Sequence, residues 1–205
     1  MKRTATLGLH IALLLALFGG PLAAAQAEQP AMPEMTPEQK AEMEMYMKAA
    51  APGPQHQWMA STAGNYDLKV KSWHEPGGPA SEETATAVRT MTMDGRVLVE
   101  DVKGTMMGMT FMGHGMRGYD NVTGKYWGTW VDSMGTGVMV SEGSCDDQGT
   151  CTFTGSWNDP VKKGVVTARM TSRWTSPTTE VFEMYAPDKS GKEMKMMEIT
   201  YTKKG

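Results

Sequence analysis

The sequence predicts an all-β protein, an antiparallel up-and-down β-barrel of about ten strands with one or two N-terminal helices. After Asn65, short alternating or apolar segments recur at regular intervals between turn-forming residues, which is typical of a β-meander. This part of the sequence also has no helical segment that could join parallel strands. A meander of this length protects its edge strands most simply by closing into a ring. A two-sheet sandwich with a filled interior is the alternative.

The N-terminus has the features of a secretory signal peptide. Lys2 and Arg3 precede an apolar run over residues 7–18, and Ala25-Gln26-Ala27 matches a cleavage pattern. We therefore predict a signal peptide over residues 1–27, a flexible leader over 28–35, and an exported protein, periplasmic or secreted. A retained membrane anchor is the alternative, although the apolar run is shorter than the roughly 20 residues that a membrane-spanning helix needs.

The charge balance argues against nucleic acid as a partner. The full chain of 205 residues has a net charge of −3, and removal of the signal peptide would take away two basic residues and no acidic ones. The mature chain is then acidic and has no basic cluster that would attract nucleic acid or anionic lipid. No later segment is apolar enough to span a membrane as a helix. We expect a monomer or a weak dimer.

The segment 36–62 carries helix signals and precedes the barrel domain, which is expected over residues 63–205. Thr36 is placed as the N-cap, with Pro37 as the first helical residue and Gln39 completing a capping box. Residues 51–54, APGP, end this helix. A second short helix is expected at about residues 55–62.

The remaining chain reads as strands joined by turns. In the first strand, Tyr66, Leu68 and Val70 alternate with charged residues, which gives the strand an apolar and a charged face. Asp94-Gly95 predicts a hairpin turn. The strands are expected at residues 66–73, 84–92, 96–104, 110–119, 126–133, 138–145, 151–157, 165–174, 180–185 and 193–202.

Cys145 and Cys151 are the only two cysteines, and they flank the turn-forming segment DDQGT. In an oxidising compartment such a pair favours a disulfide that clamps one hairpin. A free thiol pair or a metal site is the alternative, but CxxC spacing is absent.

Residues 105–116, TMMGMTFMGHGM, contain five methionines and one histidine. On a strand, Met112, His114 and Met116 project from the same face, where thioether and imidazole groups could bind Cu(I). Methionine also fills irregular apolar gaps, and these residues could equally line a core or a pocket. Both interpretations stay open.

A second group of residues is a candidate ligand pocket. Glu183 and Glu198 fall on strands expected to be neighbours, and Arg169 lies on the strand before them. Facing inward, they would form a paired polar cluster that could bind a polar group, whereas facing outward they would be a solvated surface. The aromatic candidates for the same pocket are Tyr119, Trp130 and Tyr185.

We do not predict catalysis, although an enzyme is not ruled out by the sequence. Ser133 lacks a G-x-S-x-G context, and no recognisable Ser-His-Asp spacing is present. No cofactor is predicted apart from Cu(I) as the alternative. Haem ligation by His114 is a further alternative. The sequence has no CxxCH motif, which excludes covalent attachment of haem only.

The chain resembles a mostly bacterial family catalogued as domain of unknown function number 1579. The resemblance rests on residues 56–68 (HQWMASTAGNYDL), 118–137 (GYDNVTGKYWGTWVDSMGTG), 153–160 (FTGSWNDP) and 182–204, together with the leading methionine-rich helix. It implies a calycin-like barrel, similar in outline to lipocalins and nitrobindin, and no established activity. From the predicted barrel and the methionine and aromatic residues expected to line it, we expect an exported protein that holds a small apolar or amphiphilic molecule, with a periplasmic Cu(I)-binding protein as the alternative.

Overall fold

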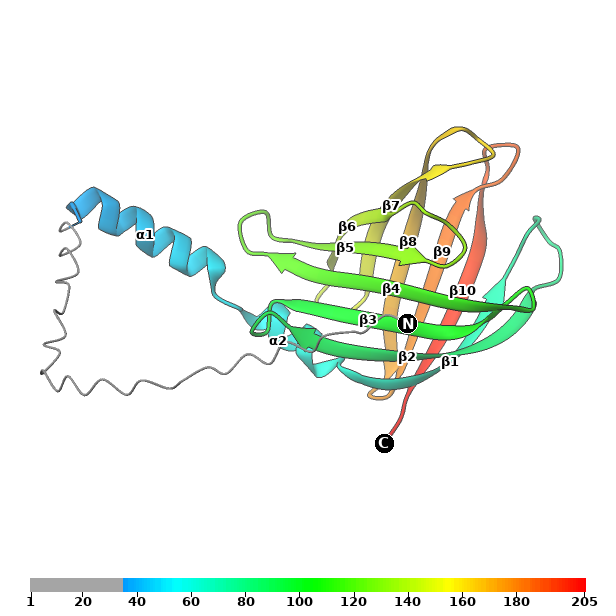
Figure 1. The fold of residues 1–205 in the computed structure, drawn as a ribbon, viewed down its shortest axis with the longest axis horizontal. Helices are drawn as coiled ribbons and strands as arrows, with labels where there is room; N and C mark the ends of the chain where they lie inside the picture. The colour runs from blue at the N-terminus through cyan, green and yellow to red at the C-terminus, as the bar shows by residue number, and fades with distance from the viewer. Residues whose placement is uncertain (1–34) are drawn as a thin grey trace, which may run out of the picture.

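The computed structural model of the protein describes residues 35–205. The predicted signal peptide, residues 1–27, and the leader up to residue 34 lie outside the described residues. Two helices precede ten strands (Figure 1). Their bounds are α1 Pro37–Ala50, α2 Pro54–Ser61, β1 Gly64–Ser72, β2 Ser81–Thr92, β3 Val97–Met106, β4 Met109–Asp120, β5 Lys125–Asp132, β6 Met139–Cys145, β7 Cys151–Asp159, β8 Gly164–Ser176, β9 Thr179–Pro187 and β10 Glu193–Lys203.

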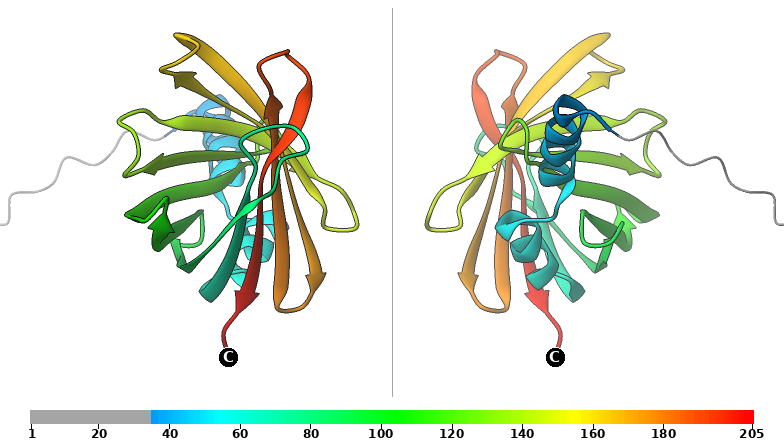
Figure 2. Two further views of the ribbon diagram at one scale, coloured as in Figure 1. Left: turned by 90° about the vertical axis from the view of Figure 1, so that its right-hand side faces the viewer. Right: turned by 90° about the vertical axis from the view of Figure 1, so that its left-hand side faces the viewer.

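The ten strands form one closed antiparallel barrel. Each strand pairs with the next in sequence, and β1 pairs with β10 to close the ring (Figure 2). At this seam Tyr66 is the partner of Lys203, and Leu68 is the partner of Tyr201. The predicted up-and-down barrel is therefore confirmed, and the alternative of a two-sheet sandwich is wrong because no strand edge is left unpaired in the ring.

Alternation along each strand decides which side chains point into the barrel. On β1, Tyr66 and Leu68 are buried, while Asp67 and Lys69 between them are exposed. The apolar face predicted for this strand is thus the inner face. The same parity, carried through the strand registers, places Ala87 and Arg89 of β2 inside as well.

One end of the barrel is covered by α2, and we call it the plugged end. The hairpins β2–β3, β4–β5, β6–β7 and β8–β9 lie at this end. Met59 of α2 is fully buried in a cluster with Leu98, Tyr126 and Phe153. Trp58 contacts the Tyr126 ring edge-on, with 5.8 Å between the ring centroids. Burial of these aromatic and sulfur-containing side chains holds the helix against the strands.

Helix α1 begins with the predicted capping box. The Gln39 N–H donates to Thr36 Oγ1 at 3.2 Å, and the Thr36 N–H donates to Gln39 Oε1 at 2.9 Å. The helix has no buried residue and extends away from the barrel (Figure 1). Asn121 holds its C-terminal end, since Nδ2 donates to the carbonyls of Ala49 and Ala51 at 2.8 Å each. Within residues 35–205, no helix has the length and apolar character needed to cross a membrane.

Two local features test the turn and cysteine predictions. Cys145 and Cys151 face each other across β6 and β7 and form a disulfide, as predicted. The β2–β3 hairpin differs in detail from the expected tight turn at Asp94-Gly95. It spans residues 93–96, and Met93, Asp94 and Gly95 all have positive φ angles, of 51°, 50° and 82°. The turn position was predictable, but its longer loop was not.

Candidate functional site

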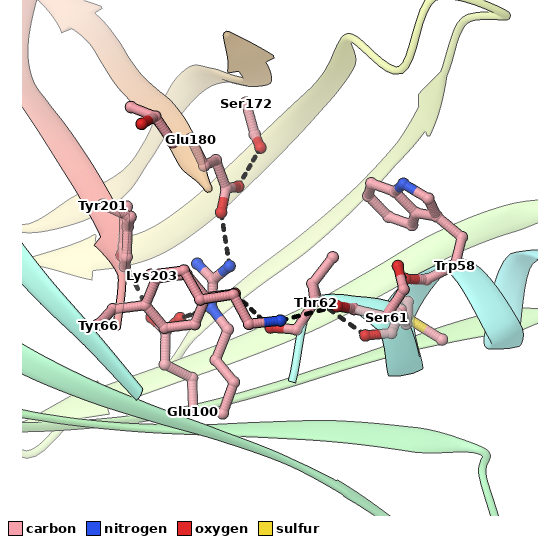
Figure 3. Close-up of polar contacts among 12 residues, drawn as sticks. Trp58, Ser61, Thr62, Tyr66, Glu100, Ser172, Glu180, Tyr201 and Lys203 are labelled. Atoms are coloured by element: carbon pink, nitrogen blue, oxygen red, sulfur yellow. Dashed lines mark hydrogen bonds and ion pairs between the residues drawn. The ribbon is translucent and has the colours of Figure 1, made fainter. Parts of the chain in front are cut away.

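The interior contains a buried cluster of charged side chains centred on Arg89 of β2. The Arg89 side chain is 4% exposed. Its Nε donates to Glu100 of β3, and its Nη1 donates to Oε2 of Glu180 of β9 at 2.5 Å. Ser172 of β8 donates a further hydrogen bond to Glu180 (Figure 3). Inside the ring, the cluster therefore joins β2 and β3 to β8 and β9, which are far apart in the sequence.

Two tyrosine rings enclose the Arg89 guanidinium. Its Cζ lies 4.8 Å from the ring centroid of Tyr66 and 4.5 Å from that of Tyr201, within cation–π range. The Tyr201 hydroxyl donates to Glu100 at 3.2 Å, and the Tyr66 hydroxyl donates to the Thr62 carbonyl at the end of α2 at 2.5 Å (Figure 3). The tyrosines thereby connect the ion cluster to the plug.

The surroundings keep Arg89 and Glu180 ionised at neutral pH. Burial raises the pKa of the Glu180 carboxyl, but Arg89 and then Arg117 outweigh burial, so the pKa lies below the ordinary 4.5. Burial also lowers the pKa of Arg89, yet Glu100 and Glu180 hold it well above its ordinary value. Burial, reinforced by Glu100, keeps the pKa of the Tyr201 hydroxyl well above 10.0, so this tyrosine stays neutral. Arg89 pairs directly with the two glutamates, and the charge of Arg117 offsets the negative charge that remains.

A second arginine, Arg117 of β4, also faces inward, because it pairs with the buried Leu98 on β3 and with Gly128 on β5. Its guanidinium lies 5.2 Å from the ring centroid of Phe153. Within residues 35–205, Arg117 has no ion pair within 4.0 Å and no side-chain hydrogen bond. Its charge still acts on Glu180 at a distance.

The inner wall beyond the ion cluster is apolar. Phe111, Trp130 and Ile199 face inward and are only partly buried. Phe111 and Trp130 lie towards the end of the barrel opposite α2, and this end has no helix over it among residues 35–205. Trp130 lies against the wall of β4, where a Cβ added at Gly113 would be 2.3 Å from the ring and one at Gly115 would be 3.0 Å from it. Glycine at these positions leaves room for the indole.

The sequence prediction grouped six residues as pocket candidates, and two of them face inward. Tyr119 lies at the plugged end, where its ring packs edge-on against Tyr126 and His56, with centroids 4.9 and 5.9 Å apart. Trp130 faces the interior, and its Nε1 donates to Asp132 at 2.9 Å. These two residues are therefore part of the inner wall.

The other four candidates lie on the outer face, because they alternate with the inward Ser172, Glu180 and Tyr201. Arg169 donates to Glu193 with Nε and Nη2, at 3.0 and 2.9 Å, and its Cζ is 4.1 Å from the Tyr185 centroid. Lys195 links the remaining two carboxylates, Glu183 and Glu198, the latter at 2.8 Å. The four side chains therefore face outward and form a polar network on the outer surface.

Two shallow hollows are present on this outer surface. One, of about 230 Å³, is lined by Arg169, Tyr185 and Glu193 among others. The second, of about 200 Å³, lies between the β1–β2 loop and β10 and is lined by Trp73 and Lys195 among others. The cations in both hollows, Arg169 and Lys195, are already paired with carboxylates, so neither hollow presents an unpaired cation.

The Met112, His114 and Met116 side chains share one outer face of β4, as their spacing predicted. Met112 is 54% exposed and Met116 39% exposed. His114 Nδ1 lies 2.8 Å from Asp101 Oδ1 on β3. Among residues 35–205 there is no group of three or more His, Cys, Asp or Glu side chains that could hold a metal ion. His114 points outward, so it could not bind a haem held inside the barrel.

Sequence reasoning missed Arg89, Glu100, Arg117 and Glu180. A signal was present, because Arg89 has the same parity as Ala85, Ala87 and Met91, so a charged residue stands between apolar neighbours on one face. Arg117 likewise follows the inward Phe111, Gly113 and Gly115. A charge on the apolar side of a predicted strand indicates a buried polar group that needs a partner.

The fold is similar to that of a solved S-type phycobiliprotein lyase, CPES, from Guillardia theta. The TM-score is 0.52 at 10% sequence identity, over 78% of this chain and 97% of that one. At this identity the likeness extends to the fold alone. A comparison with curated proteins finds no match. The family described as protein of unknown function, DUF1579, matches residues 51–203, and the chain therefore belongs to this family, as its resemblance implied.

Proposed function

We propose that this protein is an exported binding protein that holds a small apolar or amphiphilic molecule inside its barrel. The observation that carries the proposal is the partial exposure of inward-facing apolar side chains, among them Phe111, Trp130 and Ile199, in a closed ring. A ligand that covered this wall would be stabilised by about 25 cal/mol for each Å² of apolar surface removed from water. A barrel of ten strands is wider than the eight-stranded barrels that can already hold one small ligand.

The ion cluster supports this proposal because it separates the plugged end from the apolar wall. The groups around Arg89 hold one another in place without a ligand, so the wall beside them is preorganised. The structural neighbour is named a lyase, but enzyme activity is not part of this proposal.

Uptake of a neutral environment-sensitive dye, N-phenyl-1-naphthylamine, tests this function. We expect saturable binding by the wild-type protein. Val70→Trp should weaken it at least tenfold, because Val70 faces inward and a larger ring would occupy the wall. Lys69→Trp is the matched control, since Lys69 is the next residue and points outward. Equal binding by both variants, or no binding by the wild type, would contradict an interior site.

One observation favours Cu(I) binding as a second candidate. Asp101 contacts Nδ1 of His114, which leaves Nε2 available on the same exposed face as the two flanking methionines. A carboxylate in this position orients a metal-binding imidazole. Met112 and Met116 are about 13 Å apart along the strand, so one ion would take His114 and one thioether.

Anaerobic Cu(I) titration against a competing chelator tests this second candidate. Stoichiometric binding by the wild type should be lost in the Met112→Leu/His114→Ala variant, and Asp101→Asn should weaken it about 10- to 100-fold. Met93→Leu, at an exposed methionine of the β2–β3 hairpin, is the control. Failure of the wild type to compete with the chelator would remove this candidate.

A further inference from the structure

The two inward-facing arginines differ in how many partners their guanidinium groups have. Arg89 is held by two carboxylates and two aromatic rings. Arg117 has neither an ion pair within 4.0 Å nor a side-chain hydrogen bond to any residue in the range 35–205. No side-chain nitrogen in this range is both fully buried and unbonded, so the unbonded nitrogens of the Arg117 guanidinium keep some exposure to solvent.

We propose that Arg117 binds the carboxylate of an amphiphilic ligand, so that the molecule held by the barrel is a long-chain carboxylic acid. This inference rests on the proposed function and assigns a chemical class to its ligand. A guanidinium presents two parallel N–H groups that match the two oxygens of a carboxylate. A partner of this kind would also complete the hydrogen bonding of a partly desolvated charge.

The wall around Arg117 is suited to a ligand head group. Arg117 pairs with Gly128 on β5, and Gly128 pairs with Ser141 on β6. Ser141 in turn pairs with Gly155 on β7. This row of small residues continues to Ala168 on β8. The side chains nearest to Gly155 are the ends of Met139 and Met170, which are flexible and can adjust to a bound molecule.

The distance from Arg117 to the far end of the barrel suits an extended apolar tail. β4 runs from Met109 to Arg117 over about 27 Å at 3.4 Å per residue, and a strand tilt of about 40° makes this about 20 Å along the barrel axis. Phe111 and Trp130 lie on the inner wall along this path. A ligand with its head at Arg117 would therefore place its tail against these side chains.

The existing charges disfavour a ligand head group with more than one negative charge. Arg89 and Arg117 balance Glu100 and Glu180, and Arg117 already lowers the pKa of Glu180 from a distance. A single carboxylate would bond directly to the Arg117 guanidinium, whereas a doubly charged head group would be repelled about twice as strongly by Glu180.

The test compares three ligands of one chain length: dodecanoate, the neutral dodecan-1-ol and cationic dodecyltrimethylammonium. They displace the naphthylamine dye from wild type, Arg117→Met and the outer-face control Arg173→Met, whose side chain is exposed. We expect wild type and Arg173→Met to prefer dodecanoate by at least tenfold over the alcohol, since hydrogen bonds to a charged group have this magnitude. Arg117→Met should bind both equally, and Arg117→Lys should retain part of the preference.

Each of the other outcomes contradicts either the role of Arg117 or the proposed binding function. Equal affinity of the wild type for acid and alcohol, or a preference that persists in Arg117→Met, overturns the role of Arg117 while the proposed binding function stands. Dye uptake without displacement by dodecanoate also overturns the role of Arg117 alone. No dye uptake overturns both statements. If Arg117→Met does not fold, the comparison of acid with alcohol on the wild-type protein still decides.

Discussion

Arg89 on β2 and Glu180 on β9 meet inside the barrel, with 2.5 Å between Nη1 and Oε2, although they are 91 positions apart in sequence. Their side chains are 4% and 2% exposed. The pair spans the β1–β10 seam, because β2 lies on one side of it and β9 on the other. It therefore reports on closure of the ring, and removal of one member leaves a buried charge behind.

Glu180→Gln should destabilise the protein strongly. Breaking one partner of a buried ion pair typically lowers the free energy of unfolding by about 3–5 kcal/mol. Urea denaturation followed by tryptophan fluorescence measures the change. Glu142→Gln is the control, because Glu142 pairs with Lys125 on the exposed surface and should contribute about 1 kcal/mol or less. Similar effects for both variants would contradict the structural role of the cluster.

The stability of the protein should fall in acid partly through Glu180. Its pKa in the folded protein lies below the ordinary 4.5, so its contribution is complete above 4.5 and is lost as the pH falls through the lower folded value. Denaturation curves at pH 7, 5, 4 and 3 should show the difference between wild type and Glu180→Gln shrinking below pH 4.5. A difference that stays constant over this range would show that Glu180 does not titrate in this way.

The buried Tyr201 hydroxyl should make the fold sensitive to alkali. Its folded pKa is well above 10.0, so its neutral form favours folding, and this contribution is lost as the pH rises beyond 10.0 towards the folded value. Tyr201→Phe should therefore lose less stability than wild type between pH 9 and 11. Tyr46→Phe, on the exposed α1, should behave like wild type. Urea denaturation at each pH measures the free energy of unfolding of the three proteins.

Replacing the disulfide by Cys145→Ala/Cys151→Ala should lower the free energy of unfolding by about 2–3 kcal/mol, since the bridge closes a short loop in the unfolded chain. Thermal unfolding with and without a reductant measures the effect. The double variant should not respond to the reductant, whereas wild type should lose stability when reduced. An equal response in both would show that another change is responsible.

Gly113→Ala should displace Trp130. The new Cβ would lie 2.3 Å from the indole ring, so the ring has to move, and such crowding typically costs about 1–3 kcal/mol. A shift of the tryptophan emission and a lower midpoint of unfolding are expected. Gly137→Ala is the matched control, because nothing lies within 4 Å of a Cβ at Gly137.

The fold was predictable from local features, whereas the interior site was not. Alternation such as that of Tyr66, Leu68 and Val70 reports the strand itself, and turn residues such as Asp94-Gly95 report where the chain reverses. The contact between Arg89 and Glu180 depends instead on the registers of distant strands around the ring. For the same reason the sequence alone does not decide the direction of Glu183 and Glu198, which the registers of β8, β9 and β10 place on the outer face.

The pairing order has a consequence for how the chain reaches its native state. Nine of the ten strand pairings join neighbours in sequence and can form early, as hairpins. The seam between β1 and β10 requires the two ends of the domain to meet, and closing so long a loop is slow. Until that step, both edge strands expose unpaired backbone groups that can recruit another chain. The period before ring closure is therefore when this protein is most vulnerable to aggregation.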